Sequence, residues 1–338
     1  MLENYSQIIE ERLRQECDFS VIIGHDHHIV GILELIQKIK DIDIPVLIEG
    51  ESGVGKELVA RAIHFNSKRN TERLIFVNCG AIPDNLLESE FFGHEKGAFT
   101  GATAQKIGCI KAAGNGTIIL DEIDDLCLNL QVKLLHVLQS SEFTPVGSTK
   151  SQQTTARFIA VSKHNLKDLV NMGRFRDDLY YRLNVLRLYV PPLRQRKGDI
   201  SVLSEYFLEK HCQKIGKKKL AITPCALNAL MDYDYPGNVR ELENILRRAI
   251  VLCDGVFIDV EHLPFDIQEP KGIIPSNIFA DTFTKAKQKL IENFEKDYLI
   301  QQLKDAQGVI RKAAKKAGMY EANFRRKMKK HGIAAKDI

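Results

Sequence analysis

One stretch of the sequence has the residue types and spacing for phosphate chemistry, and it reads Gly50-Glu51-Ser52-Gly53-Val54-Gly55-Lys56-Glu57. A short apolar run precedes it and a helical pattern of apolar residues follows, so we predict a strand, a glycine-rich loop and a helix. Backbone N–H groups of such a loop point at anionic oxygens, and the helix adds its positive N-terminal end. Lys56 would add a charge for the β and γ phosphates, although Glu57 stands where a magnesium-binding hydroxyl is usual. The stretch predicts a nucleoside triphosphate site.

A pair of acids, Asp121 and Glu122, ends a later apolar run that begins at Gly116. Acids at the carboxyl end of a buried strand would lie opposite the phosphate loop. Asp121 would then hold Mg²⁺, and Glu122 would orient a water for attack on the γ-phosphate. A lone acidic pair is more often a helix cap, but the upstream phosphate loop favours the catalytic interpretation.

The elements that must position these residues are apolar strands alternating with helical segments. The pattern predicts an α/β domain with a doubly wound parallel sheet, ending at Pro191-Pro192. From Lys197 the pattern is purely helical, as in a small lid bundle, and Pro236-Gly237-Asn238 places Arg240 in the first turn of its last helix.

The C-terminal region is basic, with ten Lys and Arg against two Asp and Glu in residues 308–338. Two short helices, 309–317 and 320–330, meet at Gly318, and their apolar residues would form a small shared core. Helix, glycine turn and basic helix is the plan of a helix-turn-helix, whose second helix enters the major groove of double-stranded DNA. A generic basic hairpin is the alternative. The residues expected to face outward, and so to bind DNA, are Asn323, Arg325, Arg326, Lys327 and Lys329.

Composition narrows the class of protein. No apolar run is long enough to span a bilayer, so no membrane contact is expected. The seven cysteines are scattered, odd in number and never spaced as Cys-x-x-Cys, which indicates reduced thiols in a cytoplasmic protein. Three histidines near residue 26 lack a spaced acid or cysteine that would complete a ligand set, so we expect a helix cap there rather than a metal site.

Residues 20–255 resemble the AAA+ domain of bacterial sigma-54-dependent transcription activators. The most specific segment is Gly97-Ala98-Phe99-Thr100-Gly101-Ala102, the GAFTGA signature of that family. Two glycines around Ala-Phe-Thr would make a mobile tip with one exposed aromatic ring, although a buried turn is an alternative on the residues alone. The resemblance implies that this tip contacts sigma-54 when ATP is bound, and the C-terminal region resembles the family's Fis-like DNA-binding domain.

The resemblance also implies roles for single residues. The phosphate loop matches Walker A, in which Glu after the lysine is usual, and the acidic pair matches Walker B. Asn78 matches the residue that restrains the catalytic glutamate. Ile23 and Gly24 match the segment that lines the adenine pocket, and Arg240 matches sensor II, which contacts the γ-phosphate.

Two further arginines, Arg176 and Arg182, fall on the family's arginine-finger positions, which act on the nucleotide of the neighbouring subunit. That role would explain why neither has an obvious local partner in the sequence. Two positions depart from the family pattern: Lys163 replaces the sensor I asparagine, and Tyr235 replaces a tryptophan.

The expected organisation is an N-terminal arm (1–20), an AAA+ α/β subdomain (21–192), a helical lid (193–255), a linker (256–282) and an all-α helix-turn-helix domain (283–338). The resemblance implies an ATPase that forms a homo-oligomer, a hexameric ring, binds upstream enhancer DNA and remodels the sigma-54 RNA polymerase holoenzyme. An alternative is an ATP-dependent oligomeric DNA-binding regulator that does not remodel sigma-54. No sensing domain precedes Ile22, so either a regulator acts in trans or this is a shortened form of a larger chain.

Overall fold

The computed structural model describes residues 22–268, 282–306 and 309–333 of the chain. The described residues up to Ile267 form one compact unit, and those from Gln268 onward form a second. The N-terminal arm expected at residues 1–20 lies outside the described residues, as do residues 269–281 of the expected linker.

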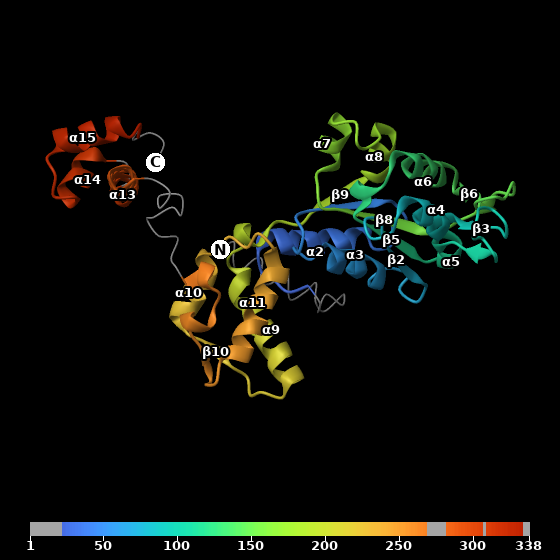
Figure 1. The fold of residues 1–338 in the computed structure, drawn as a ribbon, viewed down its shortest axis with the longest axis horizontal. Coiled ribbons are helices and arrows are strands. Elements are labelled where there is room, and N and C mark those ends of the chain that lie inside the picture. Colours follow the sequence, from blue (N-terminus) through green and yellow to red (C-terminus); the bar gives the residue numbers. More distant parts are fainter. Residues whose placement is uncertain (1–21, 269–281, 307–308, 334–338) are drawn as a thin grey trace. The chain divides into compact units, whose positions relative to one another are not determined.

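The centre of the first unit is a five-stranded sheet in the order β2-β5-β8-β1-β9, in which every pairing is parallel (Figure 1). Parallel strands are covered by helices on both faces, which is why they read in the sequence as apolar runs. The predicted doubly wound α/β fold is therefore confirmed. The strands are β1 (Val46–Glu49), β2 (Leu74–Asn78), β5 (Thr117–Asp121), β8 (Arg157–Ser162) and β9 (Leu186–Tyr189).

Helices pack on both faces of this sheet, because alternate side chains of each strand point to opposite faces. Val46 and Ile48 join the core formed with α2 (His27–Ile39) and α3 (Lys56–Phe65). Leu47 joins the core on the other face. The helices contributing there are α4 (Asp84–Phe92), α5 (Cys109–Ala113), α6 (Leu128–Ser140), α7 (Leu166–Asn171) and α8 (Asp177–Leu183).

Two small antiparallel hairpins extend from the sheet domain. Strands β3 (Gly93–His94) and β4 (Lys106–Ile107) pair on either side of the GAFTGA segment. Strands β6 (Glu142–Phe143) and β7 (Gln152–Gln153) form the second hairpin. The hairpins touch, because Val146 N donates to Gly93 O (2.9 Å) and Glu95 N donates to Val146 O (3.0 Å).

A helical lid follows the sheet, as predicted. Tyr235, an aromatic residue of the lid core, is fully buried, and its hydroxyl donates a hydrogen bond to Leu230 O (2.7 Å). The expected linker start at residue 256 is wrong, because Ile258 and Ile267 are buried in the lid core. The elements there are too short to show periodicity. The lid contains η2 (Leu193–Gln195), α9 (Asp199–Ile215), β10 (Ala221–Ile222), α10 (Pro224–Asp232), α11 (Asn238–Leu252), β11 (Phe257–Ile258), η3 (Val260–His262) and α12 (Phe265–Gln268).

The second unit contains α13 (Phe283–Asp305), α14 (Ile310–Lys316) and α15 (Glu321–Lys330). Gly318 makes the turn between α14 and α15 with a φ of +65°. The predicted shared core is present, and Leu299 and Leu303 of α13 complete it. Among the described helices of both units, none is long and apolar enough to cross a membrane. The buried residues of α14 and α15 are Ala313, Ala314, Phe324 and Met328.

Candidate functional site

The carboxyl edge of the sheet collects the residues expected to act on a nucleotide. The glycine-rich loop follows β1, which lies between β8 and β9. Asn78 ends β2 and is the register partner of Asp121, which ends β5. Lys163 directly follows β8. In open α/β sheets ligands bind at this edge, where the strand order reverses.

The loop adopts backbone angles that require glycine. Gly53 has a φ of +77°, and a Cβ there would lie 2.3 Å from Gly237 O of the lid. Lys56 Nζ donates to Gly50 O (2.7 Å) and Glu51 O (2.8 Å), so the lysine folds back over the loop. Burial lowers the pKa of Lys56, and nearby carboxylates, Asp121 first, oppose that shift. The lysine is thus held where phosphate oxygens would displace its carbonyl contacts.

The acidic pair is held in a tight arrangement. Burial raises the pKa of Asp121, although its hydrogen bond from Glu122 N (3.0 Å) opposes the shift. Glu122 has a φ of +51°, a left-handed conformation that is costly for a residue with a side chain. Its Oε2 lies so close to Gly80 that a Cβ there would be 2.4 Å away. The Glu122 carboxylate therefore points towards the β2 edge.

Two neighbours of this pair, Asn78 and Lys163, have hydrogen-bond partners other than Asp121 and Glu122. Asn78 Oδ1 accepts from the backbone N–H of Gly80 and Ala81, both at 2.9 Å, so its restraint of Glu122 stays a prediction. Lys163 Nζ lies 2.6 Å from Asp125 Oδ2, and this hydrogen bond raises the pKa of the lysine. The cation at the sensor I position thus already has a carboxylate partner.

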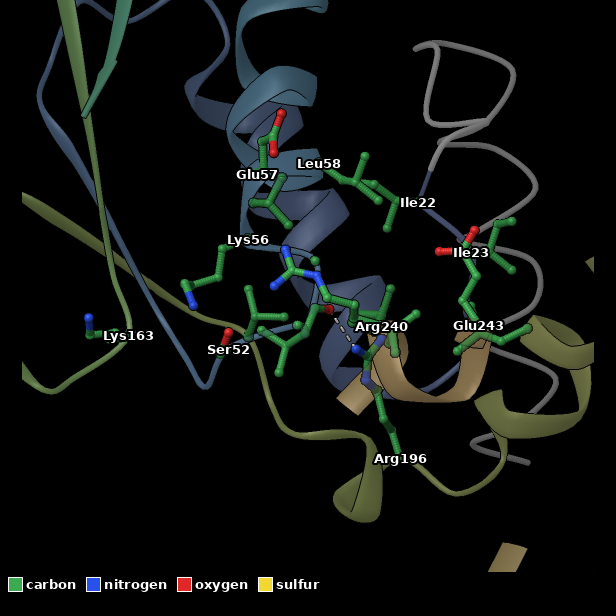
Figure 2. A pocket seen from close by; sticks show the side chains of 18 of the residues that line it. Ile22, Ile23, Ser52, Lys56, Glu57, Leu58, Lys163, Arg196, Arg240 and Glu243 are labelled. Atoms are coloured by element: carbon green, nitrogen blue, oxygen red, sulfur yellow. Dashed lines mark hydrogen bonds between the residues drawn. The ribbon is translucent and has the colours of Figure 1, made fainter. Parts of the chain in front are cut away.

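A cavity of about 540 Å³ runs along this edge and under the lid. Figure 2 shows Arg240 directed from α11 towards the side of the cavity where Lys56 lies. The polar end is lined by Ser52, Lys56, Asn78, Asp121, Glu122, Lys163 and Arg240. The other end is mainly apolar and is lined by Ile22, Ile23, Leu203, Tyr206 and Phe207, with Glu243 beside Ile23 (Figure 2). A mainly apolar end suits the base of a nucleotide, and a charged end suits its phosphates. The carboxylate oxygens beside the phosphate loop are ligands of the kind that Mg²⁺ prefers.

Three family descriptions match successive parts of the chain. They are the sigma-54 interaction domain (residues 22–189), the AAA+ ATPase lid domain (194–274) and the Fis family of bacterial regulatory proteins (290–331). The chain belongs to the family of sigma-54-dependent transcriptional activators.

Comparisons with individual proteins support this family assignment. Nitrogen fixation protein AnfA of Azotobacter vinelandii is 41% identical over 337 residues, which are 100% of this chain and 62% of AnfA. Regulatory protein AtoC of Escherichia coli K12 is 41% identical over 87% of this chain and 64% of AtoC. This activator thus spans less than two thirds of these curated relatives. The crystal structure of NtrX from Brucella abortus in complex with ATP superposes with a TM-score of 0.73 at 33% identity, over 92% of this chain and 70% of NtrX.

The two finger arginines of the activator lie on α8 and its N-cap, outside the residues that line the cavity. The expectation that they lack local partners is wrong. Arg176 forms a two-point ion pair with Asp178 (2.7 and 3.0 Å), and Arg182 Nε donates to Leu138 O (2.8 Å). Both side chains are nevertheless exposed, so a role towards a neighbouring subunit stays a prediction.

The GAFTGA tip of the activator is a closed turn at the end of an exposed segment. Gly97 N donates to Ala102 O (2.8 Å), and Gly97 and Gly101 have φ values of +83° and +107°. Phe99 is 40% exposed, and its ring lies edge-on to that of His94 at 4.9 Å. The buried-turn alternative is therefore excluded for Phe99. Contact of the tip with sigma-54 stays a prediction.

In the helix-turn-helix unit, one of the predicted DNA-binding residues does not face outward freely. Lys327 is half-buried and forms an ion pair with Glu295 of α13. His331 Nε2 also contacts Glu295 (3.1 Å), and the hydrogen bonds from Lys327 and His331 lower the pKa of this carboxyl to about 2. Lys327 therefore joins α15 to α13. The remaining predicted DNA-binding residues, Asn323, Arg325, Arg326 and Lys329, are exposed.

Sequence reasoning missed the residues that join the lid to the phosphate loop. The sequence places Asn238 only in the Pro-Gly-Asn segment at the start of the last lid helix, yet the residue is fully buried and contacts both the lid and the loop. Its Oδ1 accepts from Leu193 N (2.8 Å), and its Nδ2 donates to Ser52 O (3.0 Å). Arg194 forms a two-point ion pair with Glu51. The Pro-Gly-Asn sequence was the available signal, but its partners lie 45 and 186 residues away.

Proposed function

We propose that this activator hydrolyses ATP and uses the energy to convert the closed complex of sigma-54 RNA polymerase into an open complex. The observation that carries the proposal is one cavity that unites the phosphate loop, the acidic pair and Arg240 of the lid. In the same unit, the GAFTGA tip presents an exposed aromatic ring.

The nucleotide chemistry follows from the residues of the cavity. Lys56 and the loop N–H groups would hold the β and γ phosphates. Asp121 would hold Mg²⁺, which neutralises the charge that develops on the phosphates. Glu122 would orient the attacking water, and Arg240 would contact the γ-phosphate from the lid. The lid would then report whether the γ-phosphate is present.

The exposed finger arginines support assembly into a ring, which we propose is a hexamer. Arg176 would leave Asp178 and enter the cavity of a neighbouring subunit. An arginine supplied in trans is worth about 10³–10⁵-fold in turnover, so an isolated subunit would be nearly inactive. Hydrolysis would then depend on protein concentration.

Signal transfer to the polymerase is proposed to use the two touching hairpins. Gly147 lies against Ala98, where a Cβ would be 2.7 Å away, so movement of one hairpin displaces the other. The helix-turn-helix unit would hold the activator on upstream DNA through the exposed cations of α15. We place this activity in the cytoplasm, under the control of a regulator that acts on this chain.

The test is transcription from a sigma-54 promoter with ATP hydrolysis measured in parallel. Thr100→Ala removes a hydroxyl of the tip, and Thr103→Ala is a matched control because Thr103 is exposed just outside the tip. We expect Thr100→Ala to hydrolyse ATP without forming open complexes and the control to do both. Open complexes formed by Thr100→Ala would remove the tip from this role, whereas activation of the ordinary polymerase alone would favour a DNA-binding regulator.

A further inference from the structure

The apolar end of the cavity is bordered by residues 22–26, which precede α2 and have no regular secondary structure. Backbone N–H groups of such a segment need partners elsewhere. His25 N and Asp26 N both donate to Asp199 Oδ1, at 2.7 and 3.0 Å. Asp199 is the first residue of the lid helix α9, and its exposed fraction is 0%. One buried lid carboxylate therefore holds the base-side segment.

The packing around this carboxylate is close. Gly24 has a φ of +154°, and a Cβ on it would lie 2.6 Å from Asp199 Oδ2. Only glycine lets the segment approach the carboxylate this closely. Ile23, the neighbour of Gly24, lines the cavity. The position of Asp199 thus sets the position of the wall that would contact a base.

Arg196 joins the same carboxylate to the phosphate loop. It is 3% exposed, and its Nη2 donates to Val54 O at 2.8 Å, the hydrogen bond drawn in Figure 2. Its Nη1 lies 3.6 Å from Asp199 Oδ2. A continuous set of contacts therefore runs from the loop through Arg196 and Asp199 to the backbone of residues 25 and 26.

A contribution to the folding stability of the lid does not explain the Asp199–Arg196 pair. A buried ion pair is often no more stabilising than apolar residues of the same volume, and here burial raises the pKa of Asp199 and lowers that of Arg196. Among the described residues, Asp199 Oδ2 and Arg196 Nε have no hydrogen-bond partner although both are buried. A buried pair that bonds to both the loop and the base-side segment, with one atom of each residue left without a partner, indicates a positioning role.

We propose that Asp199 and Arg196 are positioning residues that set the base-side wall of the cavity relative to the phosphate loop. The inference rests on the proposed ATP site and deepens it. ATP would be held at both ends only when this pair joins the lid to the loop. A ligand without a base would not depend on Asp199, because its contacts lie wholly at the polar end.

The experiment compares Mg·ATP with inorganic tripolyphosphate, which has the phosphates but no base, by competition for binding to this chain. Asp199→Asn keeps the shape and one acceptor oxygen but removes the charge that faces Arg196, and Asp199→Ala removes both. Asp259→Asn is the control, because Asp259 is also a lid carboxylate that accepts from a backbone N–H (Val260 N, 2.8 Å), but it is exposed and does not line the cavity.

We expect Asp199→Ala to weaken ATP binding by about tenfold, with a raised KM and a nearly unchanged kcat, while tripolyphosphate binding changes by less than about twofold. Asp199→Asn should lie between Asp199→Ala and the parent, and Asp259→Asn should leave both affinities unchanged. If Asp199→Ala fails to fold, the same selective loss in Asp199→Asn supports the proposal.

Two results would overturn the positioning role. One is an equal loss for both ligands in the folded Asp199 variants, which means that the pair only maintains the lid fold. The other is unchanged ATP affinity in these variants. Failure of the proposed function would look different, because the parent protein itself would not bind or hydrolyse ATP.

Discussion

Replacement of Asn238 tests how strongly the lid is attached to the phosphate loop. The side chain is fully buried and makes two short hydrogen bonds, to Leu193 N and to Ser52 O. Asn238→Ala would leave the donor Leu193 N and the acceptor Ser52 O without their side-chain partner. A buried group left unsatisfied costs about 1–3 kcal/mol, so the two together cost about 2–6 kcal/mol before any water enters.

The backbone adds a second and separable cost. Asn238 has a φ of +53°, a left-handed conformation that costs an ordinary residue about 1–2 kcal/mol and glycine little. Asn238→Gly therefore isolates the loss of hydrogen bonds, and the difference between the glycine and alanine variants isolates the backbone strain. Asn238→Asp keeps the acceptor for Leu193 N but places a charge near Glu51, whose Oε2 lies 3.2 Å from Asn238 Nδ2.

The assay is urea unfolding of this chain, with and without Mg·ATP. We expect the order of stability to be parent, then Asn238→Gly, then Asn238→Ala, with the alanine variant about 3–8 kcal/mol below the parent and a weakened affinity for ATP. The reasoning is refuted if Asn238→Gly unfolds at the urea concentration of the parent. In that case the hydrogen bonds between lid and loop contribute nothing to stability.

The other predictions concern catalysis, assembly and the DNA-binding unit. Glu122→Gln should bind ATP as the parent does and hydrolyse it far more slowly; hydrolysis at the parent rate would remove Glu122 from orienting the water. Mixing Arg176→Ala with Lys56→Ala subunits should restore part of the ATPase activity that each lacks alone, because some interfaces then combine an intact loop with an intact finger; the absence of rescue would contradict action in trans. Arg326→Ala should reduce DNA affinity and lower the salt slope by about one, and an unchanged slope would show that the side chain contacts no phosphate. Because the pKa of Glu295 is lowered from 4.5 to about 2, its ion pairs should stabilise the second unit above pH 4.5 and be lost as the pH falls towards 2. Circular dichroism against pH tests this, and Glu295→Gln should remove that part of the dependence.

The sequence pattern predicted the strands and the phosphate loop of the first unit well. Its strands are apolar on both faces, and the residues of its loop are adjacent in the sequence. The phosphate loop lies within eight residues of sequence, and Asp121 and Glu122 directly end a buried strand. Parallel pairing then brings Asn78 and Asp121 together without any further information. The shared core of the DNA-binding unit was visible for the same reason, since Phe324 and Met328 are one helical turn apart on one face.

Long-range contacts between charged or polar residues were not predicted, because the two partners lie much further apart in the sequence than the repeat of a helix or a strand. Lys327 was expected on the outer face of α15, yet its partner Glu295 lies 32 residues earlier on α13. The linker prediction at residue 256 failed because β11, η3 and α12 are too short for periodicity, although Ile258 and Ile267 are buried.

The sequence by itself determined which groups this activator has for chemistry, because the glycine-rich loop, the acidic pair and the GAFTGA segment are each made of adjacent residues. Only the tertiary structure decided how the lid is joined to the loop. Asn238 and Asp199 are ordinary polar residues in the sequence, and their roles follow from complete burial against backbone groups that chain folding brings to them. Burial of a polar side chain is a property of the packed molecule, and no local pattern encodes its partner.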